Sequence, residues 1–152
     1  MSTLIYPPIP ERLLCVPFNR PYTGLVLSGR KPKETRSRAW KGAPAWIALY
    51  ATLKVVPLQA DVEDRDRLMQ LYAEPETAQH VVGIVWIAGS QPLVREDFAE
   101  SLYWGPGLHA WKCERPRRLK RLLSLAEAGL KVPPQSPVYM AGRLLEQAGF
   151  RA

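Results

Sequence analysis

The chain has 152 residues, of which 47% are hydrophobic, and this predicts one folded domain over 1–152 rather than a disordered chain. Fifteen prolines, about twice the usual share, indicate short elements and many loops and argue against a helical bundle. The formal net charge of +7 makes polyanions the first partner class to consider.

The cysteines and histidines are isolated from one another in the sequence, at Cys15, His80, His109 and Cys113. No CxxC or Cys/His spacing is present, so neither a disulfide framework nor a metal site is expected, and no motif calls for a cofactor. The N-terminus lacks the pattern of a signal peptide, and no apolar run approaches transmembrane length. These features predict a cytoplasmic protein that binds no metal or cofactor and does not contact a membrane.

Proline and glycine positions divide the first thirty residues. Residues 1–10 carry three prolines and are predicted to form an extended arm, followed by an apolar strand over Arg12–Phe18 at an edge of a sheet. Cap chemistry at Asn19 and a left-handed stop at Gly29 predict a two-turn helix over Arg20–Ser28.

Two apolar runs in the middle of the chain predict buried strands. Ala45–Ala51 is continuously apolar, and His80–Ala88 is the clearest strand, with Gly83 marking a bulge or a close backbone approach. Asp61–Tyr72 is expected to form a surface helix, and Arg95–Leu102 a short helical or irregular piece. The predicted strands and helices do not alternate regularly, as those of a doubly wound fold do. The sequence also lacks a Gly-rich phosphate loop of either common type.

The last third begins with a strand over Leu108–Cys113 and ends with a helix expected over 136–149. The basic run Lys112–Arg121 has two interpretations: a stripe that follows phosphates, or a solvated edge that discourages strand pairing. An apolar stripe over Val138–Ala148, if exposed, would dock a protein partner or a second copy, so the chain is expected to be a monomer or a weak homodimer. Strands with a few short flanking helices predict an α+β fold built on a small mixed β barrel or a curled sheet.

The charged stretch after the first predicted helix is the most informative part of the chain. Within nine residues it places one carboxylate, Glu34, among five cations: Arg30, Lys31, Lys33, Arg36 and Arg38. Such density is expected at the surface, with Lys33–Arg38 forming an exposed strand. The residues alone therefore predict an anion-binding site that contains one acid.

The order of these residues resembles the ASCH family of PUA-like domains, whose hallmark is a Gly-x-Lys-x-x-Glu-x-Arg segment after a short helix. The matching residues are Gly29, Lys31, Glu34 and Arg36. The resemblance extends over Leu13–Pro116 through later strands in the same order, at Trp46–Tyr50, Val81–Val85 and near Tyr103–Trp111. It implies a PUA-like mixed β barrel with a basic cleft in which the charged motif faces RNA or another single-stranded nucleic acid.

The resemblance also implies an alternative, a small hydrolase that uses the same cleft as a ribonuclease or as an amidohydrolase on a modified cytidine. In the amidohydrolase members a threonine stands at the position of Glu34 and is assisted by a lysine that matches Lys31. Here Thr35 comes one residue later, and on a strand its side chain is expected on the opposite face. If the protein is an enzyme, Lys31 and Glu34 are the expected catalytic pair.

Each motif residue has a binding role and a plainer alternative. Lys31 suits a phosphate, a base carbonyl or a general base, and is otherwise a solvated lysine. Glu34 suits the edge of a base or an attacking water, or is an ion-pair partner of Arg36, which would clamp either Glu34 or a phosphate. The remaining predicted nucleic-acid-binding residues are Arg30, Lys33 and Arg38 for phosphates and Tyr22, Trp40 and Trp104 for stacking, with Trp46 and Tyr103 as further stacking candidates.

Overall fold

The computed structural model describes residues 6–151, and within them the chain folds around one curved sheet. The strands are β1 (Arg12–Arg20), β2 (Lys33–Arg36), β3 (Ala45–Val55), β4 (His80–Pro92), β5 (His109–Ser124) and β6 (Val138–Ala141). The helices are α1 (Tyr22–Leu27), α2 (Arg65–Tyr72), α3 (Phe98–Ser101) and α4 (Gly142–Ala148), with short 3-10 turns η1 (Pro75–Thr77) and η2 (Arg95–Asp97).

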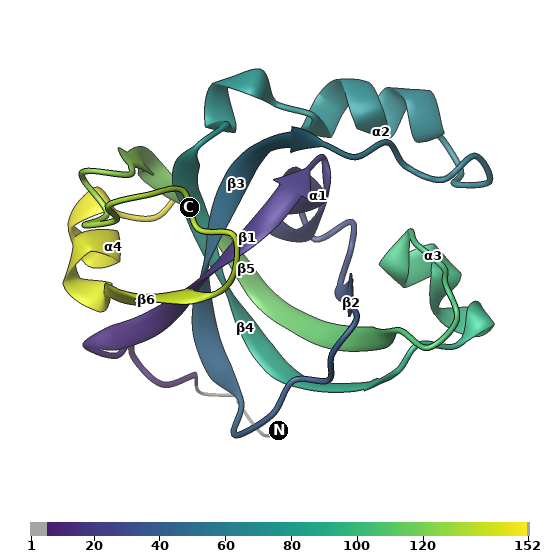
Figure 1. The fold of residues 1–152 in the computed structure, drawn as a ribbon, viewed down its shortest axis with the longest axis horizontal. Helices are drawn as coiled ribbons and strands as arrows, with labels where there is room; N and C mark the ends of the chain where they lie inside the picture. The colour runs from purple at the N-terminus through teal and green to yellow at the C-terminus, as the bar shows by residue number, and fades with distance from the viewer. Residues whose placement is uncertain (1–5, 152) are drawn as a thin grey trace.

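The strand order is β2-β5-β4-β3-β1-β6, with β1 and β3 parallel and the other neighbours antiparallel. Figure 1 shows the long strands curving, with β6 and α4 on one side of the molecule and β2 and α3 on the other. The predicted α+β fold, a curled mixed sheet with short flanking helices, is confirmed.

The sheet does not close into a continuous hydrogen-bonded barrel within residues 6–151, because its outer strands, β2 and β6, each pair on one side only. β6 pairs with the first part of β1, Arg12–Cys15, and β2 pairs with His109–Lys112 of β5. The second part of β1 therefore faces β2 across an open seam. One side chain crosses this seam: Nη2 of Arg36 on β2 donates to the carbonyl oxygen of Pro17 on β1 at 3.0 Å.

Both faces of the central strands are covered, which explains why Ala45–Ala51 is apolar throughout. On β3, Ile47 and Leu49 face the core under α1, and the alternate residues Ala48 and Tyr50 face the core under α4. The central strands are therefore buried on both faces.

Gly83 on β4 lies where the backbone approaches another strand, and the pairing with β5 shifts register between Val81 and Gly83. A Cβ atom at this position would lie 2.5 Å from the carbonyl oxygen of Arg117 and 2.6 Å from Cδ2 of Leu27. Both contacts are shorter than Cβ atoms tolerate. The prediction of a bulge or close approach at Gly83 is confirmed.

Replacing Gly83 with alanine is expected to lower the free energy of unfolding by about 1–3 kcal/mol, because β5 or α1 must shift to admit the methyl group. Thermal unfolding followed by circular dichroism measures the change. Gly105→Ala is the matched control, since the nearest atom there is Cδ1 at the flexible end of Leu108. An equal change in the two variants would contradict the packing argument.

Two sequence predictions for the last third of the chain are corrected, and the predicted N-terminal arm is described only in part. The helix expected over 136–149 is present only over Gly142–Ala148, because Val138–Ala141 forms β6 and completes the edge of β1. The strand predicted over Leu108–Cys113 begins at His109, continues to Ser124 and includes the whole basic run Lys112–Arg121. Of the arm predicted over 1–10, residues 1–5 lie outside the described residues, and 6–10 have no helix or strand.

Candidate functional site

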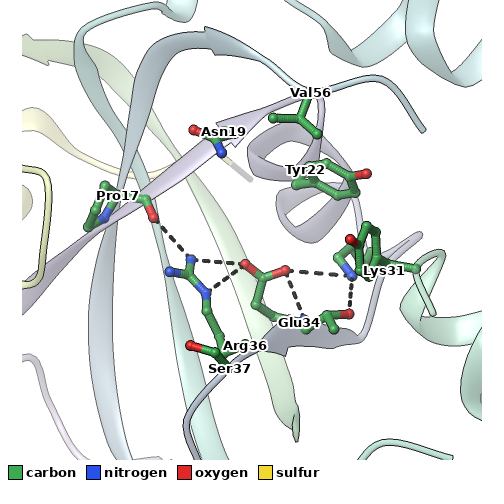
Figure 2. A pocket seen from close by; sticks show the side chains of 10 residues that line it. Pro17, Asn19, Tyr22, Lys31, Glu34, Arg36, Ser37 and Val56 are labelled. Atoms are coloured by element: carbon green, nitrogen blue, oxygen red, sulfur yellow. Dashed lines mark hydrogen bonds and ion pairs between the residues drawn. The ribbon is translucent and has the colours of Figure 1, made fainter. Parts of the chain in front are cut away.

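The seam between β1 and β2 contains a pocket of about 260 Å³. Pro17 and Asn19 of β1 lie on one side and the motif residues of β2 on the other, as Figure 2 shows. The side chains that give it its chemistry are those of Tyr22, Lys31, Glu34, Thr35, Arg36 and Tyr103. The sequence motif therefore lines a cavity rather than spreading over an open surface.

Lys31 is fully buried, with 0% of its surface exposed. Its Nζ donates to the carbonyl oxygens of Lys33 (3.0 Å) and Ser101 and to Oγ1 of Thr35 (3.3 Å), and lies 3.6 Å from Oε1 of Glu34. The expectation that this charged stretch is too dense to bury is wrong for Lys31 and also for Glu34, which is 5% exposed. The buried ammonium is tolerated because a carboxylate and three oxygen acceptors surround it.

Burial lowers the pKa of Lys31 below its ordinary value, because the desolvated ammonium is disfavoured. The nearby Glu34 carboxylate acts in the opposite direction and offsets part of this shift. The result is an amine held at the base of the pocket whose proton is easier to remove than that of a solvated lysine.

Glu34 lies between two cations. Its Oε2 accepts from Nε and Nη2 of Arg36 at 3.1 and 2.9 Å, and its Oε1 accepts the backbone N–H of Thr35 at 3.1 Å. The Arg36 guanidinium also stacks on Phe18, with its Cζ 4.5 Å from the ring centroid. The predicted ion pair between Glu34 and Arg36 is present, and it fixes the orientation of both groups at the pocket wall.

Nη1 of Arg36 donates to no protein group among the described residues, and Figure 2 shows it directed away from Glu34. The side chain is 24% exposed. Arg36 therefore keeps one donor nitrogen for a further acceptor while its other nitrogens hold the seam.

The sequence led us to expect the Thr35 side chain on the face of β2 opposite the site, because it comes one residue after Glu34. The structure places it within reach of the site. It lines the pocket, and its Oγ1 accepts from the Lys31 amine. The reason is that β2 is an edge strand: its outer side faces the seam, so a lysine entering from the preceding loop contacts residues from both faces of the strand.

Two tyrosines form an aromatic wall. The rings of Tyr22 and Tyr103 meet edge to face, with centroids 6.4 Å apart, and Nζ of Lys31 lies 5.5 Å from the Tyr22 centroid. Burial raises the pKa of Tyr22 to about 12, so its phenol is neutral, and its hydroxyl donates to the carbonyl oxygen of Pro57 at 3.4 Å. The pocket thus combines flat apolar surface with a charged base.

Two of the predicted cations form contacts outside the pocket. Lys33 binds Asp97 and Glu100 at 2.7 and 3.0 Å and so anchors α3 to β2. Arg30 is exposed, and its Nη1 donates to the carbonyl oxygen of Ala99 at 3.4 Å. Arg38 is also exposed, just beyond β2. Whether these cations contact a ligand stays a prediction.

The tryptophans predicted to stack on bases lie outside the pocket between β1 and β2. Trp40 packs against Trp111, with ring centroids 5.2 Å apart, and lines a different hollow. Trp104 is covered by Arg95, whose Cζ lies 5.2 Å from the ring centroid. Trp46 is buried. Of the proposed stacking residues, only Tyr22 and Tyr103 are brought to the pocket.

Sequence reasoning missed the contribution of β1. Asn19, interpreted as a helix cap, lies in β1, and its Oδ1 accepts the hydroxyl of Thr52 at 2.7 Å. The helix begins three residues later at Tyr22 and has no side-chain cap. Nothing in the local sequence could have placed Pro17 and Asn19 opposite β2, because the seam is created by the tertiary curvature of the sheet.

Within residues 6–151 no group of three or more His, Cys, Asp or Glu side chains is arranged to hold a metal ion. None of the helices described here is both long and apolar enough to cross a membrane.

The fold and site define a curled α+β sheet protein with a preformed charged pocket at an open seam. Solved structures with this architecture include an ASCH protein from Zymomonas mobilis and two mutants of that protein. The first gives a TM-score of 0.56 at 14% identity, and the match covers 88% of this chain and 91% of that one. The mutants give TM-scores of 0.55 and 0.56 at 14% and 15% identity, covering 88% and 91% of this chain and 94% and 96% of theirs.

No protein-family model and no curated protein sequence matches this chain. The protein has the ASCH-domain fold, so the resemblance to that family is confirmed at the level of the fold.

Proposed function

We propose that this protein binds RNA and recognises one nucleotide in the pocket between β1 and β2. The observation that carries the proposal is a concave site in which Lys31, Glu34 and Arg36 converge beside the tyrosine wall. An unpaired base needs a flat surface and a few fixed polar groups, and its phosphate needs a cation. The pocket supplies all three.

The size of the pocket supports a small ligand. At about 260 Å³ it lies near the lower end of ligand pockets, which span roughly 300–1,000 Å³. That space suits one base or nucleoside, whereas a base-paired stem would have to bind across the surface. The proposal is therefore recognition of an unpaired nucleotide, in a single strand or in a loop of a structured RNA.

The charge of the cluster supports a phosphate ligand. Lys31 and Arg36 together carry two positive charges when protonated, and Glu34 carries one negative charge, so the group has an excess of one positive charge. The exposed residues Arg30, Arg38 and Lys41 extend the positive surface beyond the pocket. Phosphates along a strand can follow this surface, which makes binding dependent on salt.

The test is fluorescence anisotropy with labelled RNA and DNA oligonucleotides of the same sequence at 50 and 200 mM salt. With two or three phosphate contacts, affinity should fall about tenfold over this range, from a slope of about −0.7 per contact. Failure of the protein to bind either polymer at the lower salt concentration would refute the proposal.

Hydrolysis of RNA or of a modified nucleoside is a second candidate, favoured by one observation. The Thr35 hydroxyl lies 3.3 Å from the Lys31 amine, whose pKa burial lowers, and this places a hydroxyl beside a potential base. Incubation with labelled RNA and with acetylated cytidine, followed by chromatography, tests this reaction. Activity that survives in Thr35→Val and in Glu34→Gln would rule out this site as its source.

A further inference from the structure

A second hollow of about 550 Å³ adjoins the nucleotide pocket along β1. The two cavities share Pro17, Asn19 and Arg36. They meet where β6 has ended, because β6 pairs only with Arg12–Cys15 and leaves the later part of β1 uncovered. A chain that leaves the first pocket over this edge enters the second hollow directly.

The second hollow contains a buried polar group that no protein atom satisfies. Tyr50 on β3 is 1% exposed, lines the hollow, and has a buried hydroxyl oxygen with no hydrogen-bond partner among the described residues. Burial also raises the pKa of Tyr50, so the hydroxyl remains protonated. A buried hydroxyl without a partner is unfavourable, and a ligand that supplies an acceptor or donor removes this cost.

The other side chains of this hollow are neutral except for Arg36 and Lys54, and they are divided evenly between polar and apolar residues. Thr52, Gln79 and Gln135 supply hydroxyl and amide groups, and Lys54 is an exposed cation at its border. Neutral donors and acceptors suit ribose hydroxyls and base edges, whereas a cation suits a phosphate. This composition differs from that of the first pocket, where charged groups dominate.

Arg36 stands between the two cavities. Its Nε and Nη2 are engaged by Glu34 and Pro17, and its Nη1 is directed away from Glu34, as Figure 2 shows. A phosphate that links two nucleotides would lie beside this guanidinium if each nucleotide occupied one cavity.

We infer that the second hollow binds the neighbouring nucleotide of the same RNA strand, so that the site takes two consecutive nucleotides with their linking phosphate at Arg36. This inference rests on the proposed function of the first pocket. Tyr50 donates its hydroxyl hydrogen to the second nucleotide, and Lys54 and Gln135 border it.

The probes are the four ribonucleoside monophosphates and the dinucleoside monophosphates ApA, CpC, GpG and UpU, titrated by calorimetry at low salt. A dinucleoside monophosphate carries less charge than a mononucleotide, so electrostatics alone would make it the weaker ligand. We expect at least one dinucleotide to bind about tenfold more tightly than its mononucleotide. Equal or weaker binding of every dinucleotide would overturn the second site, whereas no binding of any probe would overturn the proposed function itself.

Tyr50→Phe locates the second nucleotide. It is expected to weaken dinucleotide binding about fivefold, the effect of one neutral hydrogen bond, and to leave mononucleotide binding unchanged. Because the Tyr50 hydroxyl bonds to no protein group among the described residues, the variant should unfold at the wild-type temperature or above it.

Tyr139→Phe is the matched control, since Tyr139 is 59% exposed and lines neither cavity. Gln135→Ala, at an exposed position, provides a second variant with the same expected selectivity. An unchanged dinucleotide affinity in both variants would overturn the assignment.

Discussion

Replacing Glu34 with glutamine is expected to lower the free energy of unfolding by about 3–5 kcal/mol, as for other buried ion pairs that lose one partner. The reason is Lys31, which is fully buried and lies 3.6 Å from the Glu34 carboxylate. The amide retains the shape of the side chain but removes its negative charge, so the ammonium is left with only neutral acceptors. Urea denaturation at pH 7 measures the change.

Lys31→Met and the double variant show whether the effect comes from this pair. Lys31→Met leaves Glu34 bound to Arg36, so it should cost less than Glu34→Gln. In the double variant the uncompensated ammonium is gone, and its stability should exceed that predicted by adding the two single effects. Strict additivity would show that the pair is not coupled.

The same pair predicts how stability depends on pH. The pKa of Lys31 in the folded protein is lowered, so between that pKa and its ordinary value of 10.5 the unfolded chain binds more protons than the folded one. Stability attributable to Lys31 therefore rises as pH rises through this window, and is lost as pH falls through the folded pKa. Glu34→Gln removes a group that raises this pKa, so its destabilisation should shrink at alkaline pH. Subtracting the Lys31→Met curve isolates this contribution.

Replacing Arg36 with methionine is expected to weaken RNA binding by about 10- to 100-fold, the range for one hydrogen bond to a charged group. Two causes act together. The variant loses the cation placed between the two cavities, and it leaves the Glu34 carboxylate, now paired only with Lys31, facing an incoming phosphate. Anisotropy titration with a single-stranded RNA at fixed salt concentration measures the loss.

Arg38→Met is the matched control, because it removes the same charge from an exposed position just beyond β2. Its effect should be limited to the few-fold loss of one phosphate contact. Arg36→Lys should bind RNA less well than the wild type, since an ammonium cannot bond Glu34 and Pro17 in the planar geometry of a guanidinium. If Arg36→Met bound RNA no more weakly than Arg38→Met, the seam would not be the phosphate site.

The sequence predicted the charged residues that line the pocket, Lys31, Glu34 and Arg36, but not their environment. The spacing of Lys31, Glu34 and Arg36 is local, so the motif and its ion pair could be predicted from it. The burial of Lys31 could not, because an acceptor that makes it possible is the carbonyl of Ser101, distant in the chain. The second cavity depends in the same way on β3 and on the loop before β6.

Some elements of the fold were likewise predictable from the sequence, and others were not. The strands over Ala45–Ala51 and His80–Ala88 are apolar on both faces and were predictable, because burial on two sides leaves a continuous signal. Val138–Ala141 carries apolar residues at helical spacing, yet it forms β6 because it pairs with the edge of β1. Pro116 lies inside β5. The strand tolerates it because Pro116 falls in a register shift between the pairs Trp86–Glu114 and Ile84–Arg117, and β2 pairs only as far as Lys112.

The bond between Arg36 and Pro17 has a consequence for how such a site can be adapted. Backbone ladders fix the spacing of strands at a nearly constant value, whereas a side chain sets a distance that depends on its length and rotamer. The width of the opening between β1 and β2 therefore depends on this side chain as well as on the curvature of the sheet. A shorter or longer side chain at this position would resize the opening while leaving every strand pairing intact, so ligand size can change by substitution without redesign of the fold.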